Sequence, residues 1–145
     1  EHDEALKVLD EAIKMDPKKS NPRFYKGIVL GKTGKHELAL NCFENVYRAN
    51  PKHLDSLFHK GIELAELDRH GKAIEVFDKI LDKHKGNINV VYAKARSKAA
   101  LNEVNEAFDL LNVAIKHSKT IKLWARKEKV FEKFYDDPEF QRMVK

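Results

Sequence analysis

Side chains capable of acid–base, nucleophilic or metal chemistry are dispersed along this chain of 145 residues. The histidines are His2, His36, His53, His59, His70, His84 and His117. No two of them have the His-x-x-x-His spacing that would place two imidazoles on one helix face to bind a metal. The single cysteine, Cys42, has no histidine partner in a nucleophile pattern, and the sequence has no glycine-rich phosphate loop. We therefore predict no catalytic residues, no metal and no cofactor, and we predict that the chain is not an enzyme.

One acidic pair remains as a candidate for acid–base work. Asp136 and Asp137 stand directly before Pro138. Acidic residues followed by proline are typical of a helix N-terminus, where they accept hydrogen bonds from free backbone N–H groups. This interpretation is favoured over catalysis.

The composition indicates a folded, helix-rich chain. Hydrophobic residues make up 42% and charged residues 35%, with only four prolines and six glycines. The net charge of +5 is a small excess within a dense mixture of both signs. No segment has the roughly 18 apolar residues of a membrane span, and the lone cysteine favours a reducing compartment, so we predict a cytoplasmic protein with no membrane insertion. The chain does not begin with Met, and we expect it to be an excerpt of a longer protein.

A repeat of 34 residues organises the sequence. Pro17 and Pro51 are separated by this step, as are Gly27 and Gly61. A series of alanines follows the same step: Ala5, Ala39, Ala73 and Ala107. Around these positions, segments 5–17, 38–51, 72–86 and 106–119 have the apolar spacing of amphipathic helices. Segments 21–35, 53–72 and 88–103 carry a second helical pattern and end in the turn formers Gly34, Gly71 and Asn102, so the predicted unit is helix, turn, helix.

These residues resemble the tetratricopeptide repeat family. The first helix of each pair has a small residue at Gly27, Gly61 and Ala95, where two helices must approach closely. In the second helix, the repeated alanine is followed four residues later by Leu9, Phe43, Phe77 and Leu111. The resemblance implies an all-α fold, a right-handed superhelix of antiparallel helix pairs. It divides the chain into the second helix of an incomplete repeat (1–19), three repeats (20–53, 54–87 and 88–121) and a C-terminal capping helix with a short terminal helix (122–145).

The segment after Thr120 departs from the repeat. It keeps an amphipathic face, which we predict to lie in a capping helix: Leu123, Trp124, Val130, Phe131, Phe134 and Tyr135. Asp137 is predicted to begin a last short helix.

The resemblance implies a concave groove lined by the first helices, where partner proteins bind. The matching positions are Asn21, Phe24, Tyr25, Ile28 and Lys32, then Asp55, Phe58, His59, Ile62 and Glu66, then Asn89, Tyr92, Ala93 and Arg96. Phe24, Phe58 and Tyr92 recur at the 34-residue step and suit an apolar peptide or an amphipathic helix. The alternative is that these aromatic side chains pack between helices or beneath the C-terminal helix. A known subset of the family binds the C-terminal carboxylate of chaperone tails with a clamp of lysine, asparagine and arginine side chains. Four of the five clamp groups are absent at the matching positions, Asn89 stands in place of a lysine and Arg96 is displaced, so no such binding is predicted.

Three functions follow in order of preference. The first is a non-catalytic protein–protein interaction scaffold. The second is self-association into a homo-oligomer through an apolar stripe at Leu6, Leu9 and Ile13. The third, binding of nucleic acid or an acidic partner, would use a basic segment: Lys116, Lys119, Lys122, Arg126, Lys127, Lys129 and Lys133. A solvated outer helix face is the favoured interpretation of that segment, and nucleic acid is not the expected partner.

Overall fold

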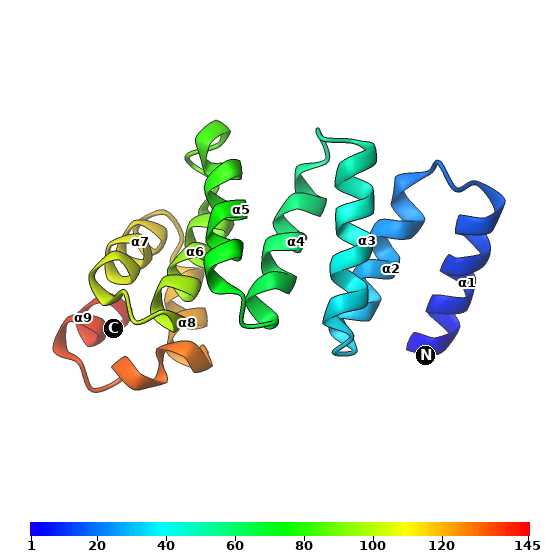
Figure 1. The fold of residues 1–145 in the computed structure, drawn as a ribbon. Helices are drawn as coiled ribbons and strands as arrows, with labels where there is room; N and C mark the ends of the chain where they lie inside the picture. Colours follow the sequence, from blue (N-terminus) through cyan, green and yellow to red (C-terminus); the bar gives the residue numbers. More distant parts are fainter. The chain divides into compact units, whose positions relative to one another are not determined.

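The fold is all-α, as the sequence predicts. A computed structural model describes all 145 residues, which form nine α-helices and one 3-10 helix (Figure 1). The chain divides into two compact units, Glu1–Val76 (unit 1) and Phe77–Lys145 (unit 2), and each is described by itself. None of the helices is long and apolar enough to cross a membrane.

Unit 1 is a series of helices packed against their neighbours in chain order. It contains α1 (His2–Met15), α2 (Ser20–Lys32), α3 (His36–Ala49), α4 (Leu54–Glu66) and the first part of α5 (His70–Lys83). Helix α2 packs against both α1 and α3, and α4 packs against α3 (Figure 1). Leu30, Ala39, Cys42 and Phe43 form the buried centre, with Leu6, Phe24 and Ile28 packed around them.

Gly27 explains how closely α2 and α3 approach. A Cβ atom at this position would lie 2.7 Å from Cε1 of Phe43 and 3.2 Å from Cβ of Cys42. Carbon atoms in ordinary contact are about 3.5–4.0 Å apart, so only glycine fits without displacement of the Phe43 ring. The sequence-based expectation that the small residue permits a close helix approach is confirmed here.

The turn inside each helix pair uses one residue in the left-handed region. These residues are Gly34 (φ 83°), Asp68 (φ 62°) and Asn102 (φ 61°), again 34 positions apart. In each turn, the following residue donates a backbone hydrogen bond across the helix end, for example Lys35 N–H to the Leu30 carbonyl at 2.8 Å, which closes the helix as in a Schellman motif. The expectation that Gly71 ends the second turn is wrong, because Gly71 lies inside α5 and Asp68 takes the left-handed position. Aspartate tolerates this conformation, so no glycine is required.

Unit 2 is closed by the segment after the last repeat. It contains the rest of α5, α6 (Ile88–Ala100), α7 (Val104–His117), α8 (Thr120–Lys127), the 3-10 helix η1 (Lys129–Phe134) and α9 (Pro138–Val144). Helices α6 and α7 pack as a pair, η1 packs against α6, and both α8 and α9 pack against α7. The buried core of unit 2 joins Phe108 and Leu111 of α7 to Phe131, Phe134 and Phe140 of the closing segment.

The predicted capping helix is broken, and its apolar face differs from the expected one. Helix α8 ends at Lys127, and Glu128 has an extended backbone (ψ 121°) before the chain turns into η1. Because of this break, Phe131 and Phe134 are buried, whereas Leu123 and Trp124 are 54% and 46% exposed. The helix start at Asp137 is confirmed, since its carboxylate accepts hydrogen bonds from the backbone N–H groups of the second and third residues of α9, at 2.8 and 3.2 Å.

Candidate partner-binding surface

Aromatic side chains of α2 and α4 come together in unit 1. The ring of Phe24 is central: its centroid lies 5.5 Å from Tyr25, 5.6 Å from Phe43, 5.1 Å from His53 and 5.5 Å from His59. Most of these pairs meet edge to face, the geometry that the charge distribution of aromatic rings favours. Phe24 therefore joins the core to the surface, with Phe43 beneath it and Tyr25 beside it.

His59 belongs to the same cluster and behaves as an aromatic residue. Its ring stacks on Phe43 at 5.2 Å and meets Phe58 edge to face at 5.6 Å. Burial lowers the pKa of His59 below its usual 6.5, and the nearby Asp55 carboxylate opposes this only in part. The imidazole is therefore neutral at pH 7, which fits an apolar surface better than a cationic one.

The remaining predicted residues of α2 and α4 differ in exposure. Ile28, Phe58 and Ile62 are half-buried, and Tyr25 is 55% exposed. The polar members are all exposed: Asn21, Lys32, Asp55 and Glu66. We call Phe24, Tyr25, Ile28, Phe58 and His59 the aromatic surface of unit 1.

In unit 2, the predicted groove residue Tyr92 is not at the surface. It is 5% exposed, with Trp124 at 5.8 Å and Phe131 at 6.2 Å between ring centroids. This is the alternative packing beneath the C-terminal segment that the sequence left open. Arg96 is held there too, because its Nη1 donates to Oε1 of Glu128 at 2.8 Å and its guanidinium lies 5.4 Å from the Tyr92 ring. Among the predicted residues of α6, Ala93 is also buried, and Asn89 is exposed.

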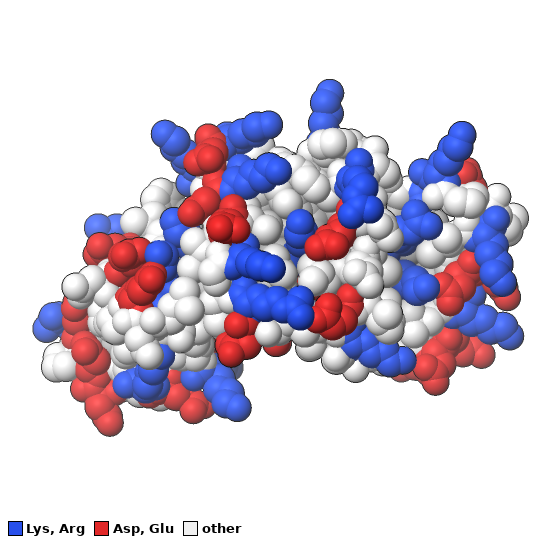
Figure 2. Space-filling view, viewed as in Figure 1, with Lys and Arg blue, Asp and Glu red and all other residues white.

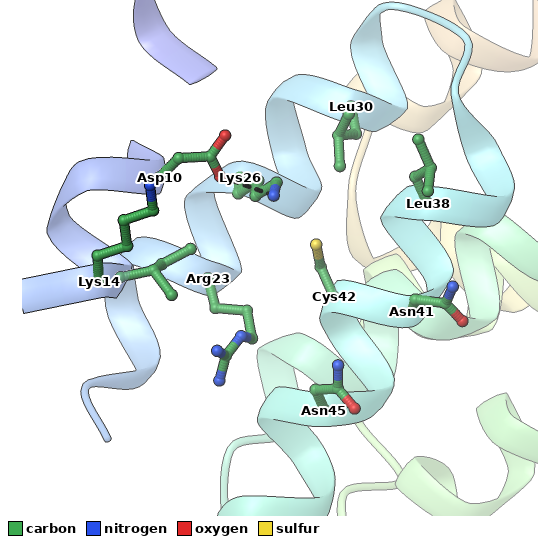
Figure 3. Close-up of a pocket in the computed structure, with 10 residues that line it drawn as sticks. Asp10, Lys14, Arg23, Lys26, Leu30, Leu38, Asn41, Cys42 and Asn45 are labelled. Carbon is green, nitrogen blue, oxygen red and sulfur yellow. Dashed lines mark ion pairs between the residues drawn. The ribbon is translucent and has the colours of Figure 1, made fainter. Parts of the chain in front are cut away.

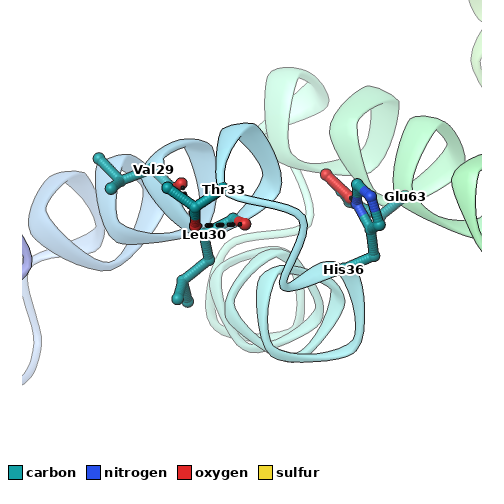
Figure 4. Close-up of polar contacts among 5 residues, drawn as sticks. All are labelled: Val29, Leu30, Thr33, His36 and Glu63. Atoms are coloured by element: carbon teal, nitrogen blue, oxygen red, sulfur yellow. Dashed lines mark hydrogen bonds and ion pairs between the residues drawn. The ribbon is translucent and has the colours of Figure 1, made fainter. Parts of the chain in front are cut away.

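Sequence reasoning missed a polar contact between His36 and the buried Glu63 in unit 1. Nδ1 of His36 on α3 and Oε2 of Glu63 on α4 lie 2.8 Å apart, and Glu63 is 6% exposed (Figure 4). Burial raises the pKa of Glu63 above its usual 4.5, and the hydrogen bond and charge of His36 offset this in part. Gly31 makes room for the pair, since a Cβ there would collide with the Glu63 carboxylate. No sequence signal points to this pair, because His36 recurs at the repeat step as His2 and His70 whereas the positions equivalent to Glu63 are Val29 and Ser97.

The basic C-terminal segment is partly occupied by contacts within unit 2. Nζ of Lys122 donates to the carbonyl of Lys145 at 3.2 Å, and Nε of Arg126 donates to the carbonyl of Val144. Nζ of Lys133 donates to the carbonyl of Ala99 at 2.7 Å. Cations at helix C-termini satisfy free carbonyl groups and oppose the helix dipole. Elsewhere the charges of both signs are interspersed over the visible face (Figure 2).

The folding pattern and a sequence match together identify the class. Paired helices that recur every 34 residues, with small residues at the helix contacts, define a helical repeat protein. Residues 26–88 match the family model of the tetratricopeptide repeat, so the resemblance to tetratricopeptide repeat proteins is confirmed in this segment. Comparison with curated protein sequences finds no match to this chain.

Solved structures extend the same fold over nearly the whole chain. MamA from Desulfovibrio magneticus, residues 41 to the end, matches with a TM-score of 0.81 at 15% identity, covering 99% of this chain and 80% of that one. A tetratricopeptide repeat protein from Parabacteroides merdae matches with a TM-score of 0.85 at 18% identity, covering 98% and 56%. YrrB, described as a TPR protein with an unusual peptide-binding site, matches with a TM-score of 0.72 at 15% identity, covering 98% and 74%. At these identities the likeness concerns the fold.

Proposed function

We propose that this chain is a non-catalytic protein-interaction scaffold that binds a partner peptide or amphipathic helix on the aromatic surface of unit 1. The fold supports this, because tetratricopeptide repeats present the first helices of successive pairs to a partner. YrrB, which shares the fold, supports a peptide as the partner.

The exposure of Tyr25 is the main support for this proposal. Tyr25 is 55% exposed although its ring rests edge to face on Phe24 at 5.5 Å. On α2 and α4, Ile28, Phe58 and His59 are also only half-buried. Large amphipathic side chains held rigidly at a surface are the residues that contribute most to protein interfaces. The exposed Asn21 and Asp55 at the starts of α2 and α4 supply polar groups that would orient a peptide.

The test is a binding measurement with a substitution at Tyr25. Peptides selected from a displayed library on the wild-type chain would be synthesised, and their dissociation constants measured by isothermal titration calorimetry. Tyr25→Ala is expected to weaken binding about tenfold or more, since a well-packed aromatic contact contributes at least about 1.4 kcal/mol.

The matched control is Met15→Ala. Met15 is 87% exposed on α1, so the change removes a large exposed apolar side chain elsewhere on the same unit. It should leave the dissociation constant unchanged. If Tyr25→Ala binds as tightly as the wild type while remaining helical by circular dichroism, the aromatic surface is not the binding site.

Self-association is the second candidate function, and α1 supplies the observation that favours it. Val8 and Met15 on this helix are 63% and 87% exposed, while Leu6, Leu9 and Ile13 are only half-buried. An apolar stripe of this kind can bury itself against a second copy. Sedimentation velocity over a concentration series distinguishes the two functions, because Val8→Glu would shift a self-associating chain towards monomer and leave peptide binding intact.

A further inference from the structure

A cleft of about 540 Å³ lies between α1, α2 and α3 in unit 1 (Figure 3). Its apolar lining consists of Ile13, Leu30, Leu38 and Cys42. Leu30 and Cys42 are 4% and 9% exposed and form the floor, whereas Leu38 is 53% exposed at the rim. The volume falls within the range of about 300–1,000 Å³ that is typical of ligand pockets.

The cleft is on the opposite side of α2 from the aromatic surface. An α-helix turns by about 100° per residue, so Arg23, Lys26 and Leu30 share one face. The same rotation places Tyr25 and Ile28 on the other face. A ligand in the cleft would therefore leave the aromatic surface free.

Cations dominate the polar lining. Lys14, Arg23 and Lys26 face the cleft together with a single acid, Asp10. Nζ of Lys26 is paired with Oδ1 of Asp10 at 2.7 Å, which Figure 3 shows as a dashed line. Lys14 has no carboxylate partner, and the hydrogen bond of Arg23 is a long one of 3.4 Å to the carbonyl of Pro17. Two cations are thus left without a counter-charge beside an apolar floor.

Comparison along the repeat shows that this cleft is an exception. At the positions equivalent to Arg23, the next two repeats have Leu57 and Val91, which are 2% and 5% exposed. At the positions equivalent to Asn41 on the rim, they have the acids Glu75 and Asp109. The first repeat therefore has a cation where the next two repeats have a buried aliphatic residue. It also has a neutral amide where the next two repeats have an acid.

Two amides complete the lining. Asn41 and Asn45 are exposed on α3, one helical turn apart, and both line the cleft. An asparagine side chain donates and accepts hydrogen bonds as a peptide group does, so this pair can bind the backbone of an extended segment. The thiol of Cys42 adds no reactivity, because burial raises its pKa and keeps it protonated despite Lys26 and Arg23.

We propose that this cleft is a second binding site, for an acidic peptide segment that carries one aliphatic anchor residue. The anchor would pack on Leu30, Leu38 and Cys42. Its acidic neighbours would pair with Arg23 and Lys14, and its backbone would hydrogen-bond to Asn41 and Asn45. Charge complementarity selects this partner, since the cleft joins two uncompensated cations to an apolar floor.

The experiment uses a defined probe. A fluorescein-labelled peptide with one leucine flanked by glutamates is titrated with the whole chain at low and high salt, and fluorescence anisotropy is measured. Two further peptides replace the glutamates with glutamines or with lysines. Saturable binding of the glutamate peptide alone, weakened by salt, is expected. Absence of saturable binding, or equal binding of the lysine peptide, would overturn the proposal.

The repeat itself suggests the variants. Arg23→Leu installs the residue of the next repeat, and Asn41→Glu restores the acid of the next repeat, so both changes suit the scaffold. Each is expected to weaken binding about tenfold or more, because each removes or opposes a charge-assisted contact. Asn105→Glu is the matched control, since it makes the same change at an exposed asparagine on α7, and it should bind as the wild type does.

The outcomes separate the alternatives. If both variants bind like the wild type, the cleft is not the site. Because Asn41 is exposed, Asn41→Glu keeps the test valid even if Arg23→Leu disturbs the packing around α2. A single-stranded oligonucleotide serves as competitor, at the same concentration of negative charges as the peptide. If the oligonucleotide displaces the peptide, the cleft is not specific for an acidic peptide and the proposal is refuted. Tyr25→Ala does not touch the cleft, so its result bears on the proposed function alone.

Discussion

Gly27→Ala is the sharpest test of the packing between α2 and α3. The new Cβ would lie 2.7 and 2.8 Å from two atoms of the Phe43 ring and 3.2 Å from Cβ of Cys42. Phe43 is 1% exposed and is enclosed by the core of unit 1, so the ring cannot swing into solvent. Forcing an extra methyl group into a packed core costs about 1–3 kcal/mol, and contacts this short favour the upper half of that range.

The helix itself would gain from the same change. Alanine in place of a helical glycine contributes about 1 kcal/mol through backbone propensity. The net expectation for Gly27→Ala is a loss of about 1–2 kcal/mol in the free energy of unfolding, given the two opposing contributions. Gly71→Ala is the matched control: Gly71 also lies in a helix, but a Cβ there has no atom within 4 Å. That variant should gain about 0.4–1 kcal/mol.

Urea denaturation followed by circular dichroism measures both variants, and amide hydrogen exchange locates the change in unit 1. Phe43→Leu in the Gly27→Ala background should recover part of the loss, because a smaller side chain leaves space for the methyl group. The double-mutant cycle then gives a favourable coupling energy. If Gly27→Ala is as stable as Gly71→Ala, the close approach of the two helices is not a packing constraint and the reasoning fails.

Substitutions at three further positions test the polar groups of the fold. The folded chain binds a proton at Glu63 more tightly than the unfolded chain does, so the contribution of Glu63 to stability should fall as pH rises from 4.5 through the raised pKa. The lowered pKa of His59 acts in the opposite direction, so the Glu63 contribution is measured as the difference between the wild type and Glu63→Gln in urea titrations across this range. Tyr92→Phe removes a buried hydroxyl that has no hydrogen-bond partner and should stabilise unit 2 by about 1 kcal/mol in thermal unfolding. Asp68→Val, which cannot easily adopt the φ of 62° and removes the contact of Asp68 Oδ1 with His70 Nε2 at 2.9 Å, should destabilise the α4–α5 turn by about 1–2 kcal/mol in the same assay. Asp68→Gly removes the same contact without backbone strain, so it should be more stable than Asp68→Val.

The parts of the fold that repeat were predictable from the sequence. Ala39, Ala73 and Ala107 are each 0% exposed, and Phe43 and Phe77 beside them are 1% and 0% exposed. Equivalent positions in successive repeats contact equivalent neighbours, so the same packing applies to all of them. Periodicity therefore indicates burial reliably wherever the environment also repeats.

The burial of Tyr92 could not be predicted from the repeat. In sequence it is equivalent to Phe24 and Phe58, which are half-buried, yet it is 5% exposed. Its cover comes from Trp124 and Phe131, which lie outside the repeat, so periodicity could not place them. At the break between α8 and η1, Glu128 pairs with Arg96 of α6 at 2.8 Å, a contact between residues 32 positions apart that local helix signals do not reveal.

One lysine–carboxylate ion pair recurs in every helix pair and therefore belongs to the scaffold rather than to a binding site. Lys26 pairs with Asp10 at 2.7 Å, Lys60 with Glu44 at 3.8 Å, and Lys94 with Asp78 at 2.7 Å, all at the 34-residue step. Because the same pair is present in each repeat, it cannot make one repeat select a partner that the others reject. Selectivity must arise at positions where the repeats differ. On one face of α2 the differing residue is Tyr25, whose equivalents in the next two repeats are His59 and the buried Ala93. On the opposite face the differing residue is Arg23. Two faces of one helix therefore carry the non-repeating residues, and this is why we infer two separate sites on unit 1.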